Sequence, residues 1–144
     1  MKRFIWMLFS LMALSYAQEF CVKEKEGAFV DDPYIKAYTI RAVQDALIEA
    51  DNRIDCADKS SKTIILKITN FSSMPIGYSI YQRANNYILN IGIELDVDGQ
   101  KHVYTQSSYY ALPSGSEGDI PKRQAFEDAI NRIKDNIVSD FIKK

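Results

Sequence analysis

The sequence predicts an α+β two-layer sandwich, in which a mainly antiparallel sheet of about four strands carries two helices packed on one face. Residues 86–97 alternate apolar and polar side chains, as a strand with one buried face does. Residues 33–52 and 119–141 repeat apolar side chains every three or four positions, which is typical of amphipathic helices. The length of 144 residues, with 47% hydrophobic and 26% charged residues, suits one globular core.

Residues 1–17 have the pattern of a secretory signal peptide. Lys2 and Arg3 precede an apolar run over residues 4–14, and small residues then stand at the positions that signal peptidase prefers. The run is shorter than the roughly 20 residues of a membrane span, so a retained anchor is the weaker alternative. We therefore expect cleavage after Ala17, export, and a single mature domain over residues 18–144.

The charge balance of the mature chain argues against nucleic acid as a partner. Removing Lys2 and Arg3 leaves 18 − 2 = 16 basic residues against 19 acidic ones, a net charge of −3. Nucleic-acid binding needs a basic face that displaces counterions from the phosphates. We expect no nucleic-acid partner.

Both cysteines, Cys21 and Cys56, lie in the mature chain. In an exported protein two cysteines more often pair than stay free, so a disulfide between them is expected. Lipid attachment to Cys21 is the alternative, although Gln18, Glu19 and Phe20 are not the small or aliphatic residues that usually precede a lipidated cysteine. The sequence leaves Cys21 disulfide-bonded, lipidated or free.

The first elements are a short strand over residues 19–22 and a helix that begins at Asp32 and Pro33. An aspartate is a good N-cap, and proline suits the first helical position. The helix should end near residues 51–52. Its apolar stripe consists of Ile35, Tyr38, Ala42, Val43, Ala46, Leu47 and Ala50.

The next strand is predicted over residues 63–71, which are rich in β-branched side chains. Residues 72–77 contain serine, proline and glycine and should interrupt it, so that residues 78–82 resume the sheet as a bent or bulged continuation. The strand over residues 86–97 follows, and residues 103–110 return beside it.

The turn at Asp98 and Gly99 allows two registers. A two-residue loop pairs Ile93 with Tyr104, whereas a three-residue loop over residues 97–99 pairs Ile93 with Val103. The three-residue loop keeps a consistent inner face on the returning strand, so we expect that register.

The chain then passes through a loop over residues 111–118 to a final helix capped by Asp119, with Pro121 in its first turn. Its apolar stripe consists of Phe126, Ala129, Ile130, Ile133, Ile137 and Phe141.

No catalytic or metal-binding constellation is indicated. The single histidine, His102, sits beside the predicted turn and should be a solvated strand residue. The carboxylate pairs are explained by the helix cap at Asp31 and Asp32 and by the turn at Asp96 and Asp98. We expect no enzyme activity, no metal and no cofactor.

Tyrosines concentrate in the predicted sheet. We expect them to cover the face that the helices leave open, either as cross-strand aromatic pairs or as a surface for a ligand or protein. They are Tyr78, Tyr81, Tyr87, Tyr104, Tyr109 and Tyr110. The outward residues of the central strand, Asn86, Ile88, Asn90 and Glu94, should belong to the same surface.

From Pro33 to the C-terminus the sequence resembles the lipopolysaccharide-assembly lipoprotein (LptE) family. The resemblance rests on an exported chain and on the helices IKAYTIRAVQDALIEA and RQAFEDAINRIKDNIVSDFI. It also rests on the strand ILKITNF, the segment PIGYSIYQRANNYILNIGIELDVDG and the strand YTQSSYY. The family normally has a lipidated cysteine at the cleavage site, which this chain lacks in standard form.

The resemblance implies a non-enzymatic accessory subunit of the lipopolysaccharide translocon on the periplasmic side of the outer membrane. Its partners would be a large outer-membrane β-barrel protein and lipopolysaccharide. From side-chain chemistry alone, we expect Arg83 and Lys101 to meet the lipid phosphates, with Tyr78 and Tyr81 on the partner surface. The alternatives are a soluble periplasmic protein-binding or inhibitor module that uses the tyrosine-rich face, and a small secreted enzyme.

Overall fold

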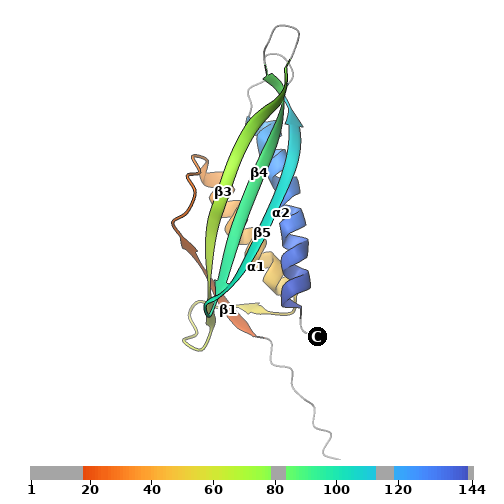
Figure 1. Cartoon of the computed structure of the whole chain (residues 1–144). Coiled ribbons are helices and arrows are strands. Elements are labelled where there is room, and N and C mark those ends of the chain that lie inside the picture. Colours follow the sequence, from red (N-terminus) through yellow and green to blue (C-terminus); the bar gives the residue numbers. More distant parts are fainter. Residues whose placement is uncertain (1–17, 79–83, 113–118, 143–144) are drawn as a thin grey trace, which may run out of the picture.

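The computed structural model describes residues 18–78, 84–112 and 119–142 (Figure 1). The predicted signal peptide, the retained-anchor alternative, Tyr81 and Arg83 lie outside these residues. In chain order the elements are β1 (Glu19–Lys25), α1 (Pro33–Glu49), β2 (Arg53–Ile54), β3 (Lys62–Tyr78), β4 (Ala84–Val97), β5 (Gln100–Ala111) and α2 (Asp119–Phe141).

The fold is the predicted α+β sandwich, with both helices on one face of the sheet (Figure 1). The sheet has five strands, in the order β2-β1-β3-β4-β5. β1 runs parallel to both of its neighbours, and the pairs β3–β4 and β4–β5 are antiparallel. The additional strand is β2, whose two residues are too few to leave a periodic pattern in the sequence.

Helix α1 begins where the sequence predicts. Asp32 is its N-cap and accepts a hydrogen bond from the backbone N–H of Tyr34 at 3.0 Å, with Pro33 in the first turn. The predicted stripe is buried except for the partly exposed Tyr38. Thr39 is also buried, and its hydroxyl donates to the carbonyl of Ile35 at 2.7 Å. The helix ends at Glu49, and Asp51 follows it with a φ of 62°.

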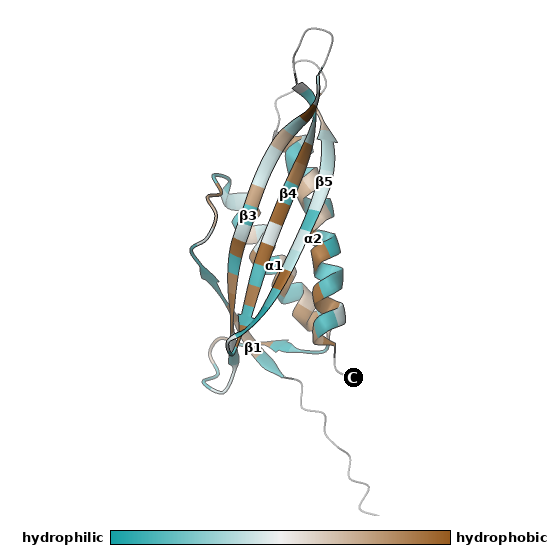
Figure 2. Cartoon of the chain, in the orientation of Figure 1, coloured by the Kyte–Doolittle hydropathy of each residue, from teal (hydrophilic) through white to brown (hydrophobic). Residues whose placement is uncertain are grey.

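Helix α2 packs against the sheet and α1 with the predicted stripe, of which only Phe141 is partly exposed. Phe126 lies at the centre of this contact and makes edge-on ring contacts with Tyr38 of α1 and Phe71 of β3. Figure 2 shows the matching pattern on the strands, where hydrophobic and hydrophilic residues alternate. The core therefore lies between the sheet and the two helices.

Strand β3 is continuous over 17 residues, so the prediction that residues 72–77 interrupt it was wrong. The turn-forming residues are accommodated because β1 pairs with β3 only as far as Lys67. Beyond that point β3 is an edge strand, where the missing N–H of Pro75 leaves no ladder bond unmade. Register shifts between Ile68 and Asn70, and around Gly77, absorb the remaining irregularity.

The turn between β4 and β5 has two residues, so the prediction of a three-residue loop was also wrong. Val97 pairs with Gln100, and Asp98 and Gly99 both have positive φ, 53° and 85°. This is the conformation whose twist matches a two-residue hairpin. The side chain of Asp96 supports the turn by accepting from the N–H of Gly99 at 2.9 Å.

The two-residue turn places polar residues on the inner face of β5. Tyr104 is 6% exposed and donates to Asp140 at 2.8 Å, while Val103 is 62% exposed on the outer face. His102 is a strand residue, as predicted, but its side chain is only partly solvated because it packs against the ring of Phe141, with 5.2 Å between the ring centroids. An edge strand can carry such residues inward because polar and aromatic groups of α2 receive them.

Cys21 and Cys56 are joined in a disulfide, which ties β1 to the segment after β2. The bond closes a chain separation of 35 residues. In the chain-entropy treatment such a loop contributes about 4 kcal/mol to the free energy of unfolding. Because the Cys21 sulfur is used in this bond, it is not available for a lipid thioether.

Candidate functional site

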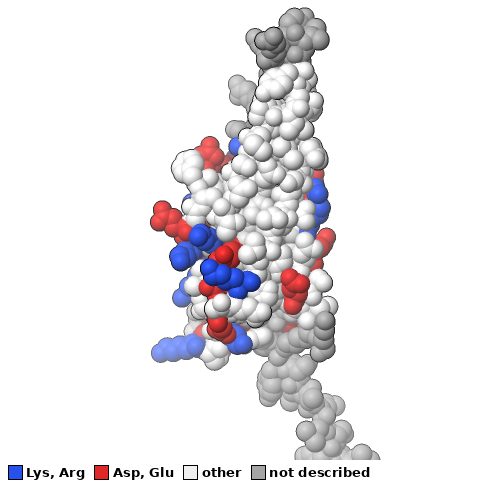
Figure 3. All heavy atoms as spheres, in the orientation of Figure 1, with Lys and Arg blue, Asp and Glu red and all other residues white. Residues whose placement is uncertain are grey.

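The outer face of the sheet, opposite the helices, is left open by the two layers (Figure 1). Its charged side chains gather at one end, as Figure 3 shows. Near the β4–β5 turn, Lys101 lies 3.3 Å from a carboxylate oxygen of Glu94, and Lys62 lies 3.6 Å from one of Asp98. The remaining length of the face has a different composition.

We call this remaining part the charge-free face. It consists of four rows that run across β3, β4 and β5, set by the strand register: Asn70, Gly92 and Thr105; Ser72, Asn90 and Ser107; Met74, Ile88 and Tyr109; and Gly77, Asn86 and Ala111. None of these residues is Lys, Arg, Asp or Glu. At this end the three strands extend past the start of α2 (Figure 1).

The charge-free face has two shallow hollows, one on each side of Tyr109, whose side chain is 69% exposed. The first has a volume of about 440 Å³ and is lined by Asn70, Asn90, Thr105 and Ser107 among others. The second has a volume of about 380 Å³ and lies between Ile76, Gly77 and Asn86 on one side and Tyr109 on the other. Amides, hydroxyls and an aromatic ring therefore converge without a charge.

Of the predicted site residues that the structure describes, Tyr78 and Lys101 are not brought together by the fold. Tyr78 is 65% exposed at the end of β3, where it pairs with Ala84. Lys101 pairs with Asp96 at the opposite end of the sheet. Asp96 in turn pairs with Ile65, which is 13 residues before Tyr78, or about 40 Å along an extended strand. The two residues can therefore serve one partner only if that partner spans most of the sheet.

The tyrosines are divided between the two faces. Tyr104 points toward the helices and is buried, so the prediction that it covers the open face was wrong. Burial, followed by the hydrogen bond to Asp140, raises the pKa of Tyr104 far above its usual value. Tyr87 and Tyr110 pair with each other on the same side as Tyr104, so the prediction was wrong for them as well. Their rings stack 5.1 Å apart, and the hydroxyl of Tyr110 hydrogen-bonds to Ser73. Tyr109 remains as the exposed aromatic ring in the middle of the charge-free face.

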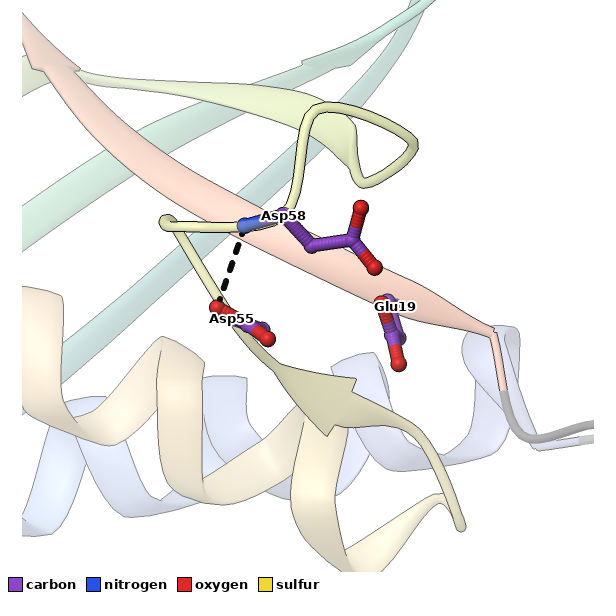
Figure 4. A group of neighbouring side chains, drawn as sticks. All are labelled: Glu19, Asp55 and Asp58. Atoms are coloured by element: carbon purple, nitrogen blue, oxygen red, sulfur yellow. Dashed lines mark hydrogen bonds between the residues drawn. The ribbon is translucent and has the colours of Figure 1, made fainter.

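A second cluster, which the sequence did not indicate, is the acidic group of Glu19, Asp55 and Asp58. Figure 4 shows their carboxylates converging from β1 and from the segment after β2, with oxygens within 4.8 Å of one another. A hydrogen bond with Asp58, and then burial, raise the pKa of Glu19, while the backbone N–H of Ser60 lowers that of Asp58. Arg53 lies 3.9 Å from Glu19 and balances part of this charge. Exposed carboxylates of this kind are not by themselves a metal site.

A third feature joins the starts of the two helices. Arg123 of α2 donates to both carboxylate oxygens of Asp32, at 2.9 and 3.1 Å. The hydrogen bonds from Arg123 are the main cause that lowers the pKa of Asp32. Beside this pair lies a cavity of about 260 Å³, and Lys122 sits over the ring of Phe71 at 5.4 Å from its centroid. Because the ion pair joins α2 to the N-cap of α1, we interpret this group of residues as packing between the two helices.

In the described residues no helix is both long enough and apolar enough to span a membrane.

Among solved structures, a minor lipoprotein from Acinetobacter baumannii has the same fold. Its TM-score is 0.51 with 7% identity, and the match covers 85% of this chain and 92% of that chain. The rare lipoprotein B from Shewanella oneidensis matches with a TM-score of 0.46 and 11% identity, over 85% of this chain and 87% of that chain. At 7% identity the likeness to the Acinetobacter baumannii lipoprotein concerns the fold alone.

In sequence, no family model matches the chain. An uncharacterised protein of Aquifex aeolicus (strain VF5) is 32% identical over 130 residues, which cover 90% of this chain and 88% of that protein. At this identity and coverage the whole domain is shared, and the chain belongs to the same family as the A. aeolicus protein.

Proposed function

We propose that the protein is a non-enzymatic accessory subunit of the lipopolysaccharide translocon, on the periplasmic side of the outer membrane. The observation that carries the proposal is the architecture, in which both helices cover one face of a long sheet and leave the other face open. That face can lie against the wall of a large β-barrel while lipopolysaccharide passes beside it. The fold shared with a minor lipoprotein and the predicted signal peptide support an exported, envelope-associated protein.

The disulfide refines this proposal. Lipoproteins are held at a membrane by a lipid on a cysteine after the signal peptide, but the sulfur of Cys21 is bonded to Cys56. Attachment to the envelope therefore comes from the barrel partner and not from a lipid on Cys21. A protein that depends on its partner in this way should leave the membrane fraction when the barrel is depleted.

The proposal that the protein is not an enzyme draws on the reactive side chains. Both cysteines are in the disulfide, so neither supplies a thiolate. The single histidine, His102, packs against Phe141. These are the residue types that most often act as nucleophile and general base.

Affinity purification of the tagged full chain from detergent-solubilised envelopes tests the translocon assignment. The expected result is co-purification of the translocon barrel, identified by mass spectrometry, in a defined ratio to the tagged chain. Recovery of a soluble periplasmic protein in its place would reject the proposal and favour the binding or inhibitor module. Depletion of the barrel should shift the tagged chain out of the membrane fraction.

Lipopolysaccharide binding by charge-reversal variants tests the proposed contacts. Lys101→Glu and Arg83→Glu should each weaken binding of purified lipopolysaccharide, because a carboxylate repels the lipid phosphates. Arg41→Glu is the control, because Arg41 is highly exposed on α1, in the opposite layer. Unchanged binding in both test variants would remove Lys101 and Arg83 from the site.

A further inference from the structure

The four rows of the charge-free face alternate in chemistry along the strands. The row of Met74, Ile88 and Tyr109 is apolar and aromatic. On one side of it lies the row with Asn90 and Ser107, and on the other side lies the row with Asn86. Successive rows on one face of a strand are about 7 Å apart. A ligand that covers three rows therefore meets an apolar strip bordered on both sides by amides.

The polar groups beside this strip can still bind a ligand. Ser107 donates its hydroxyl hydrogen to the amide oxygen of Asn90 at 2.6 Å, which fixes that amide and leaves both of its N–H hydrogens available. The amide of Asn70 has no partner among the described side chains and faces the larger hollow. Donors and acceptors are thus held by neighbouring strands at the border of an exposed ring.

This pattern excludes two ligand classes. An anionic headgroup requires a cation, and the charge-free face has none. An acyl chain or a bilayer would cover the amides of Asn70, Asn86 and Asn90 without giving them hydrogen bonds, which costs free energy for each buried amide. The surface suits a ligand that is itself uncharged, apolar on one face and rich in hydroxyls at its edges.

We propose that the charge-free face binds a neutral saccharide chain. The C–H face of a sugar ring packs on the ring of Tyr109, and its hydroxyls exchange hydrogen bonds with Asn90 and Asn70 on one side and with Asn86 on the other. The two hollows beside Tyr109, of about 440 and 380 Å³, receive the neighbouring sugar units. An open, shallow site of this kind binds with a dissociation constant on the order of 1 mM or below.

The saccharide proposal does not depend on the translocon proposal. It uses the charge-free face, whereas the lipid phosphates were assigned to Lys101 at the other end of the sheet and to Arg83. If the barrel co-purifies with the chain but the chain binds no saccharide, only the saccharide proposal is overturned. If the chain binds a saccharide but no barrel co-purifies with it, only the translocon proposal is overturned.

The test is to titrate the full chain with neutral hexasaccharides of glucose, mannose, galactose and N-acetylglucosamine. Saturation-transfer NMR measures the binding. We expect saturable binding of at least one of them. Tyr109→Ala should weaken it by about tenfold or more, and Asn70→Ala should weaken it by a smaller factor. Val103→Ala is the matched control, because Val103 is 62% exposed on the same face of the same strand but lies beside Glu94.

Salt separates this mode of binding from binding by charge. Because the proposed site is uncharged, the affinity should stay constant between about 0.05 and about 0.5 M NaCl. Lack of binding by all four hexasaccharides would overturn the proposal. So would an equal loss in Val103→Ala, or an affinity that falls steeply with salt.

Discussion

The phenol of Tyr104 on β5 donates a hydrogen bond of 2.8 Å to a carboxylate oxygen of Asp140 in the last turns of α2. This bond joins the edge strand of the sheet to the end of the chain's final helix. We expect Tyr104→Phe to lower the free energy of unfolding by about 1 to 2 kcal/mol, because the ring stays buried and only the bond to a charged partner is lost. Urea unfolding measures the change. Tyr109→Phe, at an exposed position, is the control and should leave the unfolding midpoint unchanged.

The same tyrosine should make stability fall at alkaline pH. The pKa of Tyr104 is raised in the folded protein above its usual value of 10.0, mainly by burial. When the pKa of a group is higher in the folded protein than in the unfolded chain, its contribution to stability is fully present below the unfolded-chain pKa. That contribution is lost as the pH rises above the unfolded-chain pKa and through the folded-state pKa. The free energy of unfolding should therefore decrease above about pH 10, and this decrease should be smaller in Tyr104→Phe. An identical alkaline profile in both proteins would contradict the assignment.

The ion pair between Asp32 and Arg123 should stabilise the folded protein at neutral pH and lose this effect in acid. The pKa of Asp32 is lowered chiefly by Arg123, so its stabilising contribution is present above the ordinary carboxyl pKa and disappears as the pH falls through the lowered value. Asp32→Asn keeps a capping side chain but loses the ion pair, whereas Asp32→Ala loses both. Unfolding midpoints at pH 7 should rank wild type, then Asn, then Ala. In acid, the difference between wild type and Asn should vanish.

Removal of the disulfide should cost more than any of these changes. The double variant Cys21→Ala, Cys56→Ala should lose up to about 4 kcal/mol of unfolding free energy. A reducing agent should destabilise the wild type and leave the double variant unaffected. If the reducing agent had no effect on the wild type, the bond would not form in the protein as produced.

Two glycines test the backbone geometry by different mechanisms. A Cβ at Gly27 would lie 2.2 Å from the carbonyl oxygen of Ile68, where the chain crosses the edge of β3 and Ala28 donates to the same oxygen at 2.7 Å. A Cβ at Gly99 would meet nothing within 4 Å, and only its φ of 85° is unfavourable. Gly99→Ala should cost about 1 kcal/mol, and Gly27→Ala should cost clearly more. Thermal unfolding of both variants checks the order.

Features fixed by neighbouring residues were predictable from the sequence. The start of α1 depends on Asp32 and Pro33 alone, and both helix stripes follow from the periodicity of apolar residues. The two-layer fold follows from these stripes and from the alternation in β4. The predicted export of the chain favoured the disulfide between Cys21 and Cys56 that the structure has, but the sequence alone also allowed a lipidated or free Cys21.

Features that depend on distant partners were not predictable. The register of β4 and β5 was predicted wrongly because a mixture of apolar and polar residues on the inner face of β5 was taken as unfavourable. That assumption fails once Asp140 receives the phenol of Tyr104 and Phe141 packs on His102. Likewise, Pro75 signals a turn in isolation, but it sits in a strand whose neighbour β1 has already ended. The acidic cluster at Glu19 depends on the pairing of β1 with Arg53 of β2, which no local pattern indicates.

The ending of β1 at Lys25 also divides the sheet into parts that should open at different rates. Near the disulfide, β3 has a partner on both sides, whereas from Asn70 onward it has only β4. Backbone amides in the first part should exchange with deuterated solvent only when the whole domain unfolds, and those near Tyr78 and Ala111 should exchange through local opening. The chain would then present the charge-free face on its least protected segment, while the disulfide-bonded end keeps the domain folded.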